Sequence, residues 1–220
     1  MRAASHLQGC ARRAPTQRRG KRRVSRLLTA AVTEFAESGY EAATMNGIAR
    51  RARSPIGSLY QFFPNKQSVA RALRTRQIED IQALWASLRD ERASRSLDGF
   101  VNRFMELMTE FVRGHPAFVP LLDAPSSTIP VGARDRLRQL LETLLSALDP
   151  GIGSPARTRC AEVILHLNKA LMGLFARSAA RDRAWIMAEY RVLLRGYLAS
   201  HVAPRGKAPG VRRRKSRSES

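Results

Sequence analysis

The sequence predicts an all-α fold, with a small helical unit at the N-terminus and a larger one after it. Three observations predict this fold class. Apolar residues recur at intervals of three and four through most of the chain, which is the period of a helix with one buried face. No alternating apolar and polar run is long enough to indicate a strand. Glycine, proline and helix-capping residues divide the pattern into segments of ordinary helix length.

The N-terminal part predicts three helices. Apolar positions within residues 24–36 follow helical spacing, and Gly39 offers a stop. Thr44 is expected to cap a second helix of about two turns. Ser54 is expected to cap a third helix, with Pro55 in the first helical position, where its missing N–H costs nothing.

The rest of the body predicts longer helices. Asn65 is expected to cap a fourth helix, whose apolar residues continue as far as Leu88. Further apolar stripes lie at residues 100–111 and 137–148, each followed by glycine and proline. Two long final helices are expected at about 155–180 and 182–202.

Basic residues are concentrated at the two ends of the chain. Of the net charge of +21, residues 1–26 carry +9 and residues 203–220 carry +6, which leaves +6 for residues 27–202. Such segments do not repay the entropy of ordering, so we expect both tails to be disordered. They either solubilise the chain or attract phosphate without sequence preference, and the sequence leaves both readings open.

Several classes of protein do not fit the sequence. No apolar stretch follows the basic start, so a signal peptide is not expected, and no run approaches the ~20 apolar residues of a membrane span. Cys160 lies in an apolar helical pattern, which indicates a buried thiol and fits a reducing cytoplasm. No histidine or cysteine has metal-ligand spacing and no nucleophile–base order stands out, so no metal, cofactor or enzymatic activity is expected.

One segment carries a specific motif. Residues 43–66 read ATMNGIARRARSPIGSLYQFFPNK. The segment resembles the helix-turn-helix of the TetR family of transcriptional regulators, and with the first helix the resemblance covers residues 23–75. Single pieces such as G-S-L-Y mean little, whereas the ordered set at the correct spacing is specific. The matching residues are Phe35, Gly39, Tyr40, Thr44, Ile48, Ala49, Ala52, Gly57, Ser58, Leu59, Tyr60, Phe63 and Lys66.

The resemblance implies that the third helix enters the major groove of DNA with its first residues at the base edges. The residue types agree with this, because a slim leading edge of Gly57 and Ser58 is braced from behind by Leu59 and Phe63. Contacts to base edges read sequence, whereas contacts to phosphates only position the protein. The residues implied for the groove are Ile56, Gly57, Ser58 and Gln61, and those implied for phosphates are Thr44, Tyr60 and Lys66.

These assignments have simpler alternatives, which the sequence leaves open. Periodicity alone would bury Ile56, while Thr44 need only cap its helix and the ring of Tyr60 need only pack. Lys66 at a helix start opposes the helix dipole, which favours a functional role. Arg53 stands where the family has a glycine that tolerates a positive φ, at a cost of about 1 kcal/mol, and is a further candidate for phosphate contact.

For the C-terminal part, the resemblance implies a small-molecule effector site and a homodimer through the last two helices. A two-fold dimer in turn demands a palindromic operator in double-stranded DNA. Candidates to line an apolar effector cavity are Phe104, Met108, Phe111, Met172 and Phe175, although such a stripe is more often plain core. The residues expected at the dimer contact are Val163, Leu167, Leu171, Leu174, Ile186, Tyr190, Leu193 and Tyr197.

The predicted function is that of a cytoplasmic transcriptional repressor, which a small molecule releases from its operator. The alternative is a non-specific architectural protein that coats nucleic acid, and the basic tails favour this alternative. The predicted organisation is a disordered tail at 1–21, a helix-turn-helix DNA-binding domain at 22–66, an effector-binding and dimerisation domain at 67–202, and a second disordered tail at 203–220.

Overall fold

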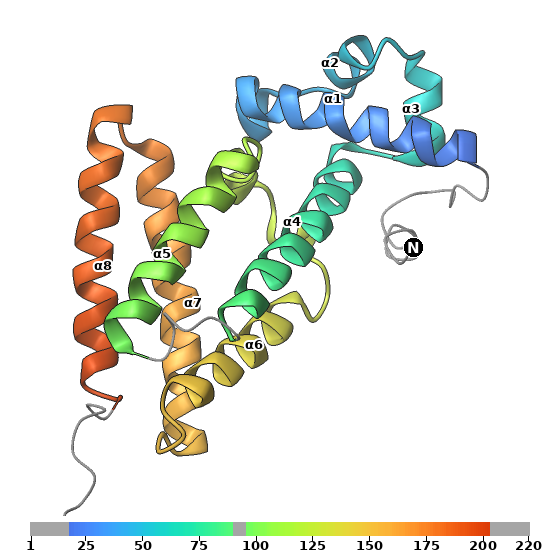
Figure 1. The fold of residues 1–220 in the computed structure, drawn as a ribbon. Coiled ribbons are helices and arrows are strands. Elements are labelled where there is room, and N and C mark those ends of the chain that lie inside the picture. Colours follow the sequence, from blue (N-terminus) through green and yellow to red (C-terminus); the bar gives the residue numbers. More distant parts are fainter. Residues whose placement is uncertain (1–17, 90–95, 203–220) are drawn as a thin grey trace, which may run out of the picture.

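The computed structural model describes residues 18–89 and 96–202, and all regular structure in these two ranges is helical (Figure 1). The prediction of an all-α fold is therefore confirmed. No helix in the described ranges is long and apolar enough to span a membrane. The helices are α1 (Arg18–Ala42), α2 (Met45–Arg51), α3 (Ile56–Phe62), α4 (Lys66–Leu88), α5 (Leu97–Gly114), α6 (Ala133–Leu148), α7 (Ser154–Arg177) and α8 (Arg183–Ala199), with short 3-10 turns η3 (Pro120–Asp123), η4 (Ser126–Thr128) and η5 (Ala180–Asp182).

Two separate groups of buried side chains hold the helices together. The first packs α1, α2 and α3 against the start of α4, around Phe35, Leu59 and Phe63. The second packs the rest of α4 against α5 to α8, around Trp85 and Phe104. Because α4 contributes to both groups, it connects the N-terminal helices to the C-terminal bundle (Figure 1).

The connection between α5 and α6 also links the two groups. Ala117, Leu121 and Ala124 lie in this connection, yet their side chains belong to the N-terminal group of buried residues. They are almost fully buried, and η3 packs directly on α1. The C-terminal bundle therefore touches the N-terminal helices at two places, through α4 and through η3.

Local capping sets the helix ends where the sequence predicts them in two cases. The Thr44 hydroxyl accepts a hydrogen bond of 2.9 Å from the Gly47 N–H and so caps α2. Asn65 caps α4 in a capping box with Ser68, in which each side chain bonds the backbone of the other residue. At Gly39 the backbone leaves helical geometry with a φ of 74°, which confirms the predicted stop of the regular helix.

Two expectations at helix starts are wrong. The N-cap of α3 is Pro55 rather than Ser54, because the extended ψ of 136° at Pro55 places it outside the helix. The Ser54 N–H instead bonds the carbonyl of Ala49, which closes the end of α2. In addition, α1 begins at Arg18, so residues 18–21 of the expected N-terminal tail are helical. The other tail residues, 1–17 and 203–220, lie outside the described residues.

Candidate nucleic-acid interface and cavity in the C-terminal bundle

A buried carboxylate fixes α2 against α1. Glu34 of α1 is only 5% exposed, and its Oε1 accepts a 3.4 Å hydrogen bond from the Thr44 N–H at the start of α2. Arg51 at the other end of α2 donates from Nε to Glu34 Oε2 at 2.6 Å and also pairs with Glu37. Hydrogen bonds to these two carboxylates raise the pKa of Arg51. One acidic side chain thus holds both ends of the short helix.

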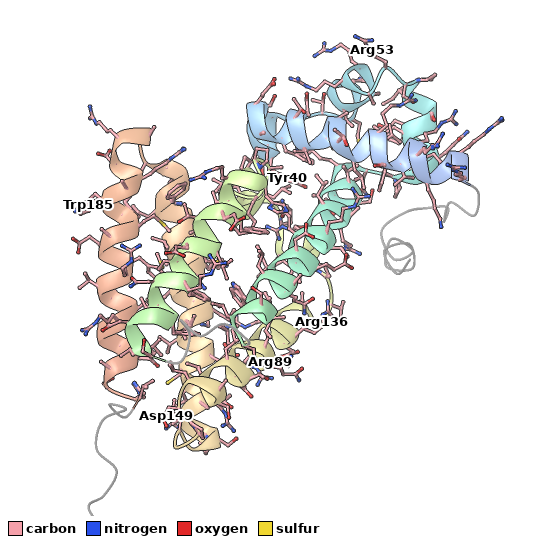
Figure 2. The ribbon with its side chains drawn as sticks, in the orientation of Figure 1. Tyr40, Arg53, Arg89, Arg136, Asp149 and Trp185 are labelled. Atoms are coloured by element: carbon pink, nitrogen blue, oxygen red, sulfur yellow. The ribbon has the colours of Figure 1, made fainter. Side chains whose placement is uncertain are left out.

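The turn between α2 and α3 has the backbone conformation that glycine favours. Arg53 has a φ of +48° and is the one non-glycine residue with positive φ in the described ranges. Its N–H bonds the carbonyl of Arg50 at 3.0 Å, which closes the turn. The side chain is exposed and projects from the outer edge of the helix-turn-helix, away from α4 (Figure 2). The strain expected at this position is therefore present.

The exposed face of α3 carries three of the four residues implied for the groove. Ile56, Gly57 and Gln61 are exposed, and Tyr60 is 43% exposed on the same face. Leu59 and the aromatic residues that follow Gln61 are buried in the N-terminal group of side chains and brace the helix from behind. Exposure of Ile56 means that the burial suggested by its periodicity does not occur, so a hydrophobic side chain stands in solvent at the leading end of α3.

The structure does not place Ser58 on this exposed face. Helical geometry puts residue 58 between the exposed positions and the buried ones, and it is half-buried. Its hydroxyl oxygen is shielded from solvent and has no hydrogen-bond partner within the described part of the chain.

Lys66 has a structural role that the sequence did not reveal. Its ammonium donates hydrogen bonds of 2.7 Å and 2.8 Å to the carbonyls of Tyr40 and Glu41 and lies 4.5 Å from the centre of the Tyr40 ring. The cation thus satisfies two backbone carbonyls at the end of α1, beyond the break in helical geometry at Gly39. This contact explains a lysine at the start of α4, and it leaves one of the three ammonium donors for a phosphate.

A basic groove next to the turn was missed by the sequence analysis. One polar face of α1 and the end of α2 enclose an open groove of about 840 Å³. Four guanidinium groups and several hydroxyls converge there, and these are the groups that bind phosphates in protein–DNA complexes. The spacing of 22, 25, 26, 29 and 33 along α1 was the available signal. The lining residues are Arg22, Ser25, Arg26, Thr29, Ala30, Thr33, Arg51, Ala52 and Arg53.

A cavity of about 370 Å³ lies in the C-terminal bundle, between α4, α6 and α7. Of the five candidate effector residues, Met108 and Met172 line it. Phe104 and Phe111 are buried in the core beside it and do not reach its wall. Phe175 lies elsewhere, with the guanidinium of Arg183 4.9 Å from the centre of its ring. The remaining wall includes Ile81, Trp85, Leu137, Leu165 and six polar or charged residues, Arg74, Gln77, Ser126, Arg134, Asn168 and Lys169.

An apolar surface remains exposed on the last two helices. Leu174 of α7 is 47% exposed, and Trp185, Val192 and Leu193 of α8 are each at least 60% exposed. Trp185 projects from the outer side of α8, away from the other helices (Figure 2). Of the expected dimer residues, Leu171, Ile186 and Tyr190 are instead buried, because they belong to the group of side chains that holds the C-terminal bundle together.

Groups of acidic, histidine or cysteine side chains that could hold a metal do not occur within residues 18–89 and 96–202. Cys160 is fully buried and unpaired, as its apolar surroundings predicted.

Two family descriptions match the chain. "Bacterial regulatory proteins, tetR family" matches residues 27–73, which include α2 and α3 and most of α1. "Tetracyclin repressor-like, C-terminal domain" matches residues 96–198, which run from the start of α5 to the end of α8. Together the two matches cover most residues of both groups of buried side chains.

Individual relatives agree with these matches. The chain is 30% identical over 173 residues to the HTH-type transcriptional repressor KstR of Mycolicibacterium smegmatis, an alignment that covers 74% of this chain and 81% of the relative. A TetR-family transcriptional regulator from Streptomyces coelicolor has a similar structure, with a TM-score of 0.63 and 30% identity over 82% of this chain and 99% of the other. The fatty acid degradation regulator FadR from Bacillus halodurans shares the fold, with a TM-score of 0.59 at 15% identity over 78% of this chain and 97% of the other.

Proposed function

The chain belongs to the TetR family of bacterial transcriptional regulators, and from that membership we propose that it is a repressor released from its operator by a small molecule. It is a sequence-specific DNA-binding regulator, as the resemblance in residues 23–75 predicted. The observation that carries the proposal is the exposed face of α3, which stands beside a groove lined by arginines.

We propose that α3 reads bases and that the groove beside it binds the DNA backbone. Ile56 presents a methyl-bearing side chain suited to a thymine methyl group, and Gln61 has an amide suited to adenine. Tyr60 lies on the same face with a hydroxyl suited to phosphate. Arg22, Arg26 and Arg53, which line the groove, supply the sequence-independent part of the affinity.

We further propose that the protein acts as a homodimer through α7 and α8. Leu174, Trp185, Val192 and Leu193 are large apolar side chains that one copy of the chain leaves exposed on two neighbouring helices. Pairing with a second copy would bury them, and the two-fold axis would place two copies of α3 on equivalent half-sites. The operator is then expected to be palindromic.

The cavity in the C-terminal bundle is the proposed effector site. Its volume and its mainly apolar wall suit a small organic molecule. It borders α4, which runs from the bundle to the DNA-binding helices. A ligand that changes the tilt of α4 therefore also changes the distance between the two copies of α3 in the dimer. A coupling free energy of about 1–3 kcal/mol is sufficient for a 5–150-fold loss of operator affinity.

The alternative of a non-specific architectural protein does not fit this family membership. The chain has the matched regulatory C-terminal domain, which such a protein would not need. The basic tails remain candidates for non-specific attraction to DNA, which adds to the affinity for operator and bulk DNA alike.

Selection from a random duplex library tests the proposal directly. The full chain is expected to enrich one palindromic motif and to prefer it over scrambled duplex by about a thousandfold or more at physiological salt. Enrichment of no motif, with equal affinity for both duplexes, would contradict it. A panel of neutral and charged small molecules, scored by the shift in melting temperature and then by release of the selected duplex, tests the effector part.

A further inference from the structure

The cavity in the C-terminal bundle has an unbalanced charge. Three of its lining side chains are cations, Arg74, Arg134 and Lys169, and none is a carboxylate. Arg134 pairs with Glu162 outside the cavity at 2.5 Å, and Lys169 is exposed at its rim. Arg74 is the cation that lies inside.

Arg74 is buried without a counterion. The residue is 9% exposed, and its guanidinium donates one hydrogen bond, to the backbone carbonyl of Leu121. No ion pair joins it to any acidic side chain within residues 18–89 and 96–202. Burial lowers the pKa of Arg74, which is the direction expected of a cation removed from water. A buried charge of this kind is costly unless a partner of opposite charge completes it.

A second buried polar group points to a ligand independently. Asn168 is 7% exposed and lines the same cavity. Its Oδ1 accepts a 2.7 Å hydrogen bond from the hydroxyl of Tyr190, which fixes the orientation of the amide. Its Nδ2 is buried and has no hydrogen-bond partner in the described chain. Buried amide donors without a partner are rare in native structures, so this donor requires an acceptor from outside the chain.

We propose that the cavity binds an organic anion with an apolar body, whose anionic group pairs with Arg74 and whose acceptor oxygen bonds Nδ2 of Asn168. The apolar body packs on Ile81, Trp85 and Met172. A guanidinium binds carboxylate and phosphate oxygens in a bidentate manner, so both anionic groups fit this chemistry. The inference rests on the proposed function of the cavity as the effector site and narrows the class of effector.

Arg74 also connects the cavity to the DNA-binding helices. Its hydrogen-bond acceptor, Leu121, lies in η3 and is buried in the N-terminal group of side chains against α1. An anion in the cavity and the Leu121 carbonyl share one guanidinium, so filling the cavity alters the hydrogen bond that holds η3. The same residue therefore recognises the ligand and transmits its presence.

Trp85 provides a local reporter for the test. The chain has two tryptophans, and Trp185 is exposed on α8, so a full-length Trp185→Phe protein reports on the cavity through Trp85 alone. Its dimeric state is checked by sedimentation. The probes are decanoate, decyl phosphate and decan-1-ol, which share one apolar chain and differ in the headgroup. We expect saturable changes in Trp85 emission, with at least one anion binding about tenfold or more tightly than the alcohol.

Arginine variants of the Trp185→Phe protein test whether Arg74 causes the preference for anions over the alcohol. Arg74→Met should abolish the anion preference, and Arg74→Lys should keep part of it. Arg71→Met is the matched control, because Arg71 lies on the same helix and donates to the carbonyl of Ser127 at 2.6 Å but does not line the cavity. Asn168→Leu should also weaken anion binding relative to the Trp185→Phe protein, because it removes the Nδ2 donor. Circular dichroism and the melting temperature identify any variant that fails to fold.

The outcomes separate this proposal from the proposed function. Loss of the preference in Arg74→Met and its retention in Arg71→Met support an anion site at Arg74, and the stronger anionic probe identifies carboxylate or phosphate. Equal binding of decan-1-ol and both anions overturns the anion proposal while leaving an apolar effector site in place. Binding of no probe also overturns it, and the proposed function is then judged by the neutral molecules of the melting-temperature panel.

Discussion

Gly47 of α2 packs directly against the carboxylate of Glu34 on α1, so closely that a β-carbon at residue 47 would overlap Oε1. The close approach lets Glu34 accept from the Thr44 N–H and from Arg51 at once, which fixes both ends of α2. A glycine inside a helix usually weakens it by about 1 kcal/mol. Here the missing side chain is what allows the buried carboxylate to reach α2.

Gly47→Ala should therefore destabilise the helix-turn-helix. The new methyl group would displace Glu34 and break its contacts, and overpacking of this kind lowers the free energy of unfolding by about 1–3 kcal/mol. Urea denaturation followed by circular dichroism measures the change. Gly57→Ala is the matched control, because a β-carbon at Gly57 meets no atom within 4 Å and should leave stability equal or slightly higher. Equal stability of the two variants would show that Glu34 is not held in place.

Arg53→Gly should separate backbone strain from phosphate binding. Glycine adopts the φ of +48° without steric cost, so the free energy of unfolding should rise by about 1 kcal/mol. Loss of the guanidinium should at the same time weaken binding to all DNA and reduce the slope of log K against log salt by about one. Arg53→Ala keeps the strain but loses the charge, so it should show only the second effect. An unchanged salt slope in both variants would remove Arg53 from the DNA contacts.

Local features of the sequence predicted most helix ends, whereas partners distant in sequence decided the exceptions. The caps at Thr44 and Asn65 depend on residues three positions away, which a sequence pattern contains. The hydrogen bonds of Lys66 reach carbonyls 25 and 26 residues earlier. Because such distant partners are not visible in a sequence pattern, a functional role was inferred for Lys66, whose observed contacts are with the end of α1.

The interface and the cavity were predicted to different extents. The motif in residues 43–66 predicted a shared face for Ile56, Gly57 and Gln61, and all three are exposed, but it did not predict that Ser58 is half-buried with its hydroxyl oxygen shielded from solvent. In the bundle, helical period indicates which face of a helix is buried but not where neighbouring helices leave a gap. Phe104 and Met108 share a face of α5, yet only Met108 reaches the cavity. Arg74 was missed because a long basic residue in a helix usually lies in solvent.

Alkaline pH should test the buried hydroxyl of Tyr190. Burial raises the pKa of Tyr190 above its ordinary value of 10.0, so the folded state keeps the proton after the unfolded state has lost it. Its contribution to stability is therefore complete below about pH 10 and falls as the pH rises above that value. Burial also raises the pKa of Tyr197, to about 12, which gives a change of the same sign. Subtracting a Tyr190→Phe curve from the native one isolates Tyr190.

The experiment compares urea denaturation of both proteins at about pH 8 and about pH 11. Tyr190→Phe should be less stable at the lower pH by about 1 kcal/mol, because it loses the hydrogen bond to Asn168. The difference between the two proteins should shrink or reverse at the higher pH. A difference independent of pH would mean that burial does not raise the pKa of the Tyr190 hydroxyl in the folded state.

Leu193→Asp should convert the proposed dimer to a monomer. The side chain is 60% exposed on α8, so the substitution is expected to leave the fold of one copy intact while placing a charge in the paired surface. Sedimentation equilibrium measures the change in mass, and circular dichroism checks the fold. Val131→Asp is the matched control, because Val131 is 97% exposed in the connection between α5 and α6. If the Leu193→Asp protein remained a dimer, the dimer contact would have to lie on another surface.

The final prediction separates base reading from positioning on α3. Gln61 is exposed and suited to a base edge, so Gln61→Ala should lose about 1–3 kcal/mol at particular operator positions while affinity for scrambled DNA changes little. Tyr60→Phe should weaken binding to operator and scrambled DNA by similar factors, because a phosphate contact carries no sequence information. The measurement is affinity for the selected operator and for its single-base variants.

Three further substitutions complete that test. Ser58→Ala should have a smaller effect than Gln61→Ala, because the Ser58 hydroxyl is shielded from solvent in the structure. Lys66→Ala should lower stability as well as affinity, since it removes two hydrogen bonds to the end of α1. Leu59→Ala should cost about 2–5 kcal/mol of stability through lost packing and reduce all binding. If Gln61→Ala left every operator position unchanged while Lys66→Ala erased one base preference, α3 would not be the reading helix, because a contact at the start of α4 would then carry the sequence information.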